Sequence, residues 1–196
     1  MAQAFSDWKN QTEQSLIEIK QLVSKLNQNN PDQLLLKPNE KSWNADECLQ
    51  HLNSYGRYYL PQIKSAVNLA KQKNQKTDLN IKGSWIGRKF TKMMSVNSQG
   101  FPSGSMKSPK DHRPISNTNS SQTLVEFESQ LRDLELIIQE CNQINLDKVR
   151  VPISISRFIK LSAADVLDFY LAHHKRHLYQ ALRAVNRINH NVKIAS

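Results

Sequence analysis

The chain has 196 residues, 38% of them hydrophobic, and with only five Gly and seven Pro it is neither collagen-like nor of low complexity. This length and composition predict a single packed domain over residues 1–196. The 27 Lys and Arg outnumber the 17 Asp and Glu by ten, which makes nucleic acid a candidate partner, while two Cys exclude a disulfide framework and a cysteine-based zinc site.

The N-terminal segment has no basic region followed by an apolar run, so no secretory leader is expected. No segment of the chain approaches about 18 consecutive apolar residues, so no transmembrane helix is expected either. These two features predict a cytoplasmic protein without a membrane partner.

Residues 3–29 are predicted to form the first helix, because their apolar side chains recur mostly at spacings of three and four. Asn29 and Pro31 end the pattern, and residues 30–43 are predicted to be a loop. The apolar positions are Phe5, Trp8, Leu16, Ile19, Leu22, Val23 and Leu26.

A second helix is predicted to begin after Asn44. Asn44 is a good N-cap, and Glu47, three residues later, completes a capping box, while Trp43 can pack on Cys48 as a hydrophobic staple. An apolar line then continues for about six turns, with a kink expected at Pro61. The line consists of Cys48, Leu52, Tyr55, Tyr59, Ile63, Ala66 and Ala70.

Residues 71–122 differ from the rest of the chain, since they hold four of the five Gly and most of the excess charge. Residues 71–113 alone contain ten Lys and Arg but only two Asp, a net charge of +8 that leaves the remaining chain nearly neutral. One short helix is predicted over 84–94, capped by Ser84. It is expected to bury Ile86, Phe90 and Met93. The whole segment is predicted to be a long basic crossover containing Gly, Ser and Pro.

The third helix is predicted over residues 123–144. Thr123 and Glu126 have the spacing of a capping box, and residues 145–161 follow as a connection. The buried stripe is Leu124, Phe127, Leu131, Leu134, Ile138 and Cys141.

The fourth helix has the clearest start, with Ser162 as cap and Asp165 three residues later. Its pattern continues to about Ile188, and no strand pair with turn chemistry is found in the chain. Four long amphipathic helices with a long connection between the second and third predict an all-α four-helix bundle.

Histidines mark the candidate site. His173 and His177 lie one turn apart on the stripe expected to face the core, so that they can bind one metal ion. His51 can supply a third ligand if the second and fourth helices are neighbours. Three imidazoles would leave coordination positions open, which is typical of catalytic rather than structural metal sites. His174 lies on the adjacent stripe and either replaces His173 or fills the core.

Several segments together resemble one known family. They are Leu36–Pro38, Ser42–Leu52, Trp85–Phe90, Lys107–Pro109, Arg113–Pro114 and Leu167–Gln180. In order and spacing they are similar to the DinB-like superfamily over roughly residues 8–188. This is a group of bacterial four-helix bundles that includes the bacillithiol and mycothiol S-transferases.

The resemblance implies a divalent metal, zinc or nickel, held by His51, His173 and His177, and it selects His173 over His174. It also implies a small-molecule thiol or electrophile as substrate. Many family members form dimers. A homodimer interface is expected to use Trp8, Leu16 and Ile19 of the first helix.

A divalent ion on three uncharged ligands lowers the pKa of a bound water or thiol. The residues alone therefore leave hydrolysis and thiol transfer open, and the resemblance favours transfer.

No general base is assigned. Asp165 and Asp168 are expected to be solvated, and His112 and His190 to be exposed. Candidates for substrate binding are Tyr55, Tyr58, Arg176 and Gln180, with core packing as the alternative for the tyrosines and solvent for Arg176.

Two other classes of function remain open. The basic crossover can neutralise phosphates, although the chain has no helix-turn-helix, zinc-finger or RNA-recognition signature. The other class is a bundle without catalysis that acts through association or in a stress response. For the crossover itself we expect either a cover that attracts an anionic substrate or a loop whose charge only keeps it solvated.

Overall fold

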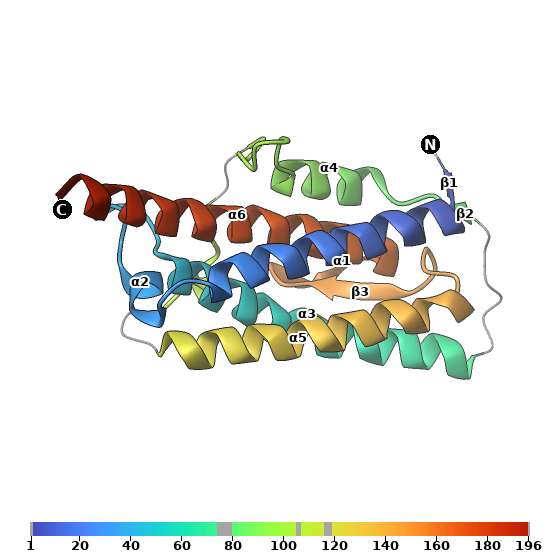
Figure 1. Cartoon of the computed structure of the whole chain (residues 1–196). Helices are drawn as coiled ribbons and strands as arrows, with labels where there is room; N and C mark the ends of the chain where they lie inside the picture. Colours follow the sequence, from blue (N-terminus) through green and yellow to red (C-terminus); the bar gives the residue numbers. More distant parts are fainter. Residues whose placement is uncertain (1, 74–79, 105–106, 116–118, 196) are drawn as a thin grey trace.

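The computed structural model describes residues 2–73, 80–104, 107–115 and 119–195. Within them, four long helices form the predicted bundle: α1 (Phe5–Asn27), α3 (Ala45–Gln72), α5 (Ser120–Glu140) and α6 (Ala163–Ala195). α3 packs against both α5 and α6, and α1 packs against α6 (Figure 1). The connection between α3 and α5 is the expected crossover, of which Lys76 and Asp78 lie outside the described residues.

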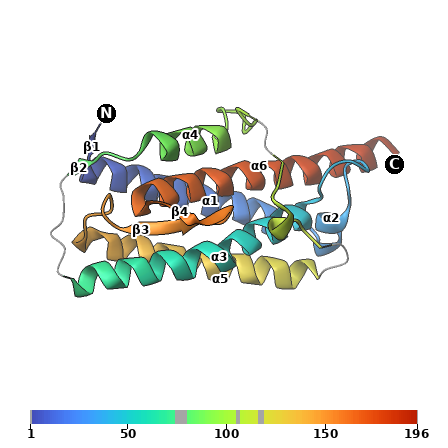
Figure 2. The same ribbon diagram turned by 180° about the vertical axis from the view of Figure 1, so that it is seen from behind.

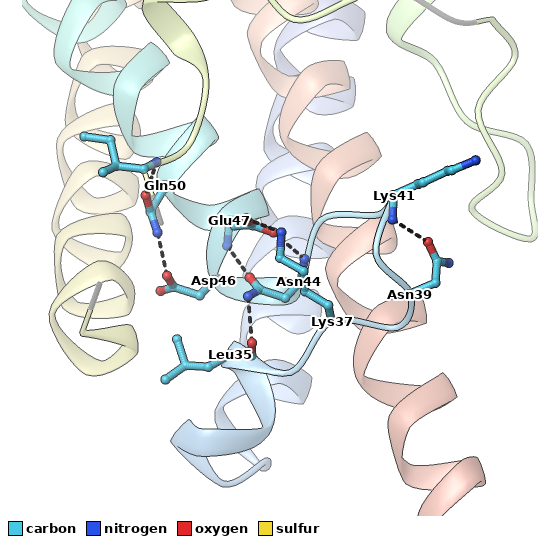
Figure 3. Close-up of polar contacts among 9 residues, drawn as sticks. Leu35, Lys37, Asn39, Lys41, Asn44, Asp46, Glu47 and Gln50 are labelled. Carbon is cyan, nitrogen blue, oxygen red and sulfur yellow. Dashed lines mark hydrogen bonds and ion pairs between the residues drawn. The ribbon is translucent and has the colours of Figure 1, made fainter. Parts of the chain in front are cut away.

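The start of α3 follows the predicted capping box. The Asn44 side chain accepts a hydrogen bond from the Glu47 N–H at 2.7 Å, and the Glu47 carboxylate accepts one from the Asn44 N–H at 2.9 Å (Figure 3). Asn44 also donates to the Leu35 carbonyl, and Lys37 pairs with Glu47 at 2.9 Å. These contacts hold the preceding loop against the helix end, two turns before His51. Pro61 lies inside α3, as expected.

The segment predicted as a loop over residues 30–43 contains a short helix, α2 (Pro31–Leu35). Asn30 and Gln33 form a capping box for it, with Pro31 at its first position. The prediction missed α2 because five residues are too few to display a 3.6-residue apolar period.

The predicted capping box of Thr123 and Glu126 is wrong. α5 begins three residues earlier, and Asn119 caps it by accepting hydrogen bonds from the Ser121 and Gln122 N–H groups. Thr123 instead donates its hydroxyl to the Asn119 carbonyl. α5 is followed by a 3₁₀ turn, η2 (Cys141–Gln143).

The expectation that the chain has no strand pair is also wrong. β3 (Arg150–Ile153) and β4 (Ser156–Ser162) form an antiparallel hairpin beside α3 and α6 (Figure 2). Its turn lacks the Gly or Asn that favours a tight hairpin, and Pro152 lies within a strand, so the sequence carried no hairpin signal. A second pair joins β1 (Gln3–Ala4) to β2 (Asn80–Ile81).

The crossover contains the predicted short helix, α4 (Trp85–Met94), whose cap is the Ser84 hydroxyl. α4 lies along α6 (Figure 1). Its buried residues are Gly87 and Met94, whereas Ile86, predicted to be buried, is 44% exposed. Gly87 is required here, because a Cβ at this position would lie 2.2 Å from the carboxyl carbon of Asp165. A 3₁₀ turn, η1 (Lys110–His112), follows farther along.

The bundle core includes Trp8, Leu16 and Ile19, each no more than 5% exposed. These three side chains are therefore buried within their own chain and cannot form the dimer interface expected for them. No described helix combines the length and the apolar character needed to cross a bilayer.

Candidate metal centre

Three buried histidines meet between α3 and α6. His51 comes from α3, and His173 and His177 come from successive turns of α6. One ring nitrogen of each lies within 4.8 Å of those of the other two. The Nε2 atoms of His51 and His173 are 3.1 Å apart. The structure thus brings together the three residues that the sequence singled out.

Two of these rings are oriented by hydrogen bonds at Nδ1. The Nδ1 of His51 lies 2.6 Å from the His112 carbonyl oxygen, and that of His177 lies 3.0 Å from the Gln180 side-chain oxygen. Both oxygens accept hydrogen bonds, so we assign the proton to Nδ1 in each ring. Each Nε2 then keeps a lone pair, which is the arrangement that outer partners impose on metal-binding histidines.

Burial favours the neutral form of these imidazoles. It lowers the pKa of His51 to about 4. It lowers the pKa of His173 and His177 well below the usual range, and repulsion from neighbouring histidine rings adds to the effect at these two residues. The rings therefore offer uncharged nitrogen donors at neutral pH. The Nδ1 of His173 is buried without a hydrogen-bond partner among the described residues. This donor set fits a divalent ion that accepts imidazole ligands.

His112, expected to be exposed, is buried. Its Nδ1 lies 2.5 Å from the Ser54 hydroxyl, and its ring centroid is 4.0 Å from that of Tyr55. These contacts hold η1 against α3, so that the backbone carbonyl of His112 reaches the Nδ1 of His51. No spacing in the sequence indicates this contact, because His112 is 61 residues away from His51. His190 is exposed, as predicted.

His174 is also buried but lies outside the three-histidine group. Its Nδ1 is 2.8 Å from the Tyr170 carbonyl, and its ring stacks on Phe127 with centroids 5.4 Å apart. Burial lowers its pKa to about 4. Of the two interpretations left open for His174, the structure favours the one in which it fills the core.

A cavity of about 300 Å³ opens onto the histidines. Trp43 forms one wall, with its ring centroid 5.0 Å from that of His51 and 5.8 Å from that of His177. Tyr55 forms another wall, 4.4 Å from the His173 ring. The crossover contributes Met94, Lys107, Ser108 and Pro109 to the lining of the cavity. It therefore lies beside the site, as the cover expected for it would.

The candidate substrate-binding residues divide into two groups. Tyr55, Arg176 and Gln180 line the cavity. Tyr58 does not, since its hydroxyl donates to the Ile153 carbonyl at 3.1 Å. The alternative in which Arg176 faces solvent is wrong, because Arg176 is half-buried, donates to the Met93 carbonyl, and has a pKa lowered by burial. Arg57 is exposed and pairs with Glu126.

The prediction that Asp165 and Asp168 are solvated is wrong for Asp165, which is buried, and Asp168 is only partly exposed. Asp165 is 3% exposed and accepts hydrogen bonds from the Ser84 N–H, so it anchors the start of α4. Asp168 accepts a hydrogen bond from the Trp8 indole N–H at 2.8 Å, and burial raises its pKa to about 6. Both carboxylates are thus structural, and neither lines the cavity.

Comparison with known proteins gives one result. Searches of curated proteins and of solved structures found no match. A model of the DinB superfamily matches residues 11–181, which include all three histidines and the crossover between them. The chain belongs to the DinB superfamily.

Proposed function

We propose that the chain is a metal-dependent enzyme that transfers a low-molecular-weight thiol to a small electrophile. The observation that carries the proposal is the convergence of three neutral imidazoles, His51, His173 and His177, on an open cavity. A divalent ion held by these ligands, zinc or nickel, would keep its full charge and lower the pKa of a thiol or water bound to it.

The charges around the cavity support thiol transfer over hydrolysis. Lys41, Lys107 and Arg176 line it, and its described lining contains no Asp or Glu. These cations would attract an anionic thiol. A carboxylate that could act as general base toward an attacking water is missing from the same set of residues.

The chain's own residues would then position the two substrates. Trp43 and Tyr55 offer aromatic walls on which the carbon skeleton of an electrophile can pack. The thiol sulfur would form the new bond to the electrophilic carbon, the leaving group would depart with the electron pair of the broken bond, and the thiol proton would pass to solvent.

The first experiment is elemental analysis of the purified chain. We expect about one divalent ion per chain, the stoichiometry of a mononuclear site, and almost none in His177→Ala. The matched control is His190→Ala, which removes an exposed histidine from the same helix. Full metal occupancy in His177→Ala would contradict the metal site.

The second experiment is a conjugation assay with the metal restored. A panel of small thiols is combined with a chromogenic aryl halide, and an ester is offered separately as a hydrolysis substrate. We expect metal-dependent loss of the thiol and no turnover of the ester. Metal-dependent ester hydrolysis without conjugation would instead establish the hydrolase alternative.

A further inference from the structure

Exposed apolar side chains gather on α4 and on the β3–β4 hairpin. Trp85 is 67% exposed and Phe158 is 92% exposed. Ile86, Ile155 and Ile159 are exposed as well. Large apolar side chains that gather on a protein surface in this way commonly mark an interaction site.

The two segments border one cleft. Phe90 of α4 and Ile155 of the hairpin line the same small apolar cleft, together with Val166 and Phe169 of α6. Ile86 lies one turn before Phe90 on α4. In Figure 2, α4 and the hairpin flank the first half of α6. Phe90 and Ile155 therefore place the two segments on either side of one cleft, and the other exposed apolar residues lie on these same segments.

Local packing turns part of this surface outward. Gly87 is buried against Asp165, which fixes the inner side of α4. Trp85 lies on the exposed side, with the Lys89 ammonium 5.2 Å from its ring centroid. In the hairpin, the pairs Pro152↔Lys160 and Ile153↔Ser156 leave three residues of β4 without a partner, and Phe158 is the middle one. This bulge explains why Phe158 is so exposed.

The charged side chains of the same two segments are all cationic. Residues 82–94 and 150–162 contain no Asp or Glu. Among the residues whose side chains the structure describes, their cations are Lys82, Arg88, Lys89, Lys92, Arg150 and Lys160. The neighbouring acids, Asp147 and Asp165, accept hydrogen bonds from the backbone N–H groups of residues 82–84.

We propose that this surface, formed by residues 82–94 and 150–162, binds the face of an anionic phospholipid bilayer. Trp85 and Phe158 would enter the interfacial region, where aromatic side chains are favoured, and the cations would meet the headgroups. A second copy of the chain would place like charges against each other. A nucleic acid would leave the aliphatic side chains Ile155 and Ile159 without a partner.

The proposal departs from the expectation of no membrane partner, which rested on the lack of a secretory leader and of a long apolar segment. A surface assembled from two distant segments is invisible to such a test. The proposal is independent of the metal centre.

The test is co-sedimentation of the full chain with phosphatidylcholine vesicles, with and without phosphatidylglycerol. We expect binding only when the anionic lipid is present, and weaker binding as salt rises. Lys89→Glu/Lys92→Glu should bind at least roughly thirtyfold more weakly, because each removed cation alone contributes about 1 kcal/mol and the new carboxylates repel the headgroups. Lys25→Glu/Lys64→Glu is the control, since it changes the net charge equally at exposed positions of α1 and α3.

Trp85→Ser/Phe158→Ser should weaken binding at least tenfold through the loss of two interfacial aromatic side chains. Val125→Ser, at an exposed apolar position of α5, is the control. Absence of binding to the anionic vesicles at low salt would overturn the proposal. Full binding of the vesicles by the serine variant would overturn it too. The same holds if the serine variant keeps lipid binding but loses DNA binding or dimer formation.

Discussion

α6 and the crossover build the two sides of the metal centre in different ways. α6 places His173 and His177 on successive turns of one helix, so their proximity follows from local geometry alone. The crossover supplies the His112 carbonyl to His51 from 61 residues away, through a turn held by Ser54 and Tyr55. The comparison indicates that local geometry pairs the two α6 ligands, whereas the place and the orientation of His51 depend on long-range packing.

The largest expected effect separates two neighbouring histidines of α6. His173→Ala should reduce the bound metal from about one ion per chain to nearly none, because it removes one of three ligands. His174→Ala should keep the metal and lower the free energy of unfolding by about 2 kcal/mol, because it leaves a cavity in the core. Elemental analysis and urea denaturation measure the two effects. Metal loss in His174→Ala alone would exchange the roles of the two residues.

A smaller effect is expected from the crossover. His112→Ala removes the ring contacts with Ser54 and Tyr55 and so loosens the carbonyl that orients His51. Outer partners of metal-binding histidines typically contribute a factor of 10–100 in affinity, and we expect roughly tenfold here. Titration of the apo chain with zinc measures it, with His190→Ala as control. Unchanged affinity would show that His51 is oriented without the crossover.

Local signals predicted the four long helices and the pairing of His173 with His177, whereas His51 was predicted on the condition that the second and fourth helices are neighbours and by the family resemblance. The capping box of Asn44 and Glu47 and the spacing of His173 and His177 act within one or two turns, so one sequence is enough to read them. The resemblance to the DinB-like superfamily, and not spacing, selected His173 over His174. Part of what failed depended on partners distant in the chain, as for Asp165, which α4 buries. The hairpin and α2 were missed for local reasons, since the hairpin turn has no Gly or Asn and α2 has only five residues.

The last expected effect depends on pH and concerns Asp168, which α1 partly buries through Trp8. Burial raises its pKa from 3.8 to about 6, although the hydrogen bond from Trp8 acts in the opposite direction. The folded chain therefore keeps the proton of Asp168 at pH values where the unfolded chain has released it. This contribution to stability is largest below about pH 4, falls as the pH rises, and is lost above about pH 6.

Asp168→Asn cannot titrate but keeps an oxygen that can accept the hydrogen bond from Trp8. Its free energy of unfolding should therefore rise relative to that of the unmodified chain across this interval, as urea denaturation at both ends would measure. A difference that stays constant with pH would mean that the Asp168 carboxylate is well solvated, and that α1 does not bury it as the structure indicates.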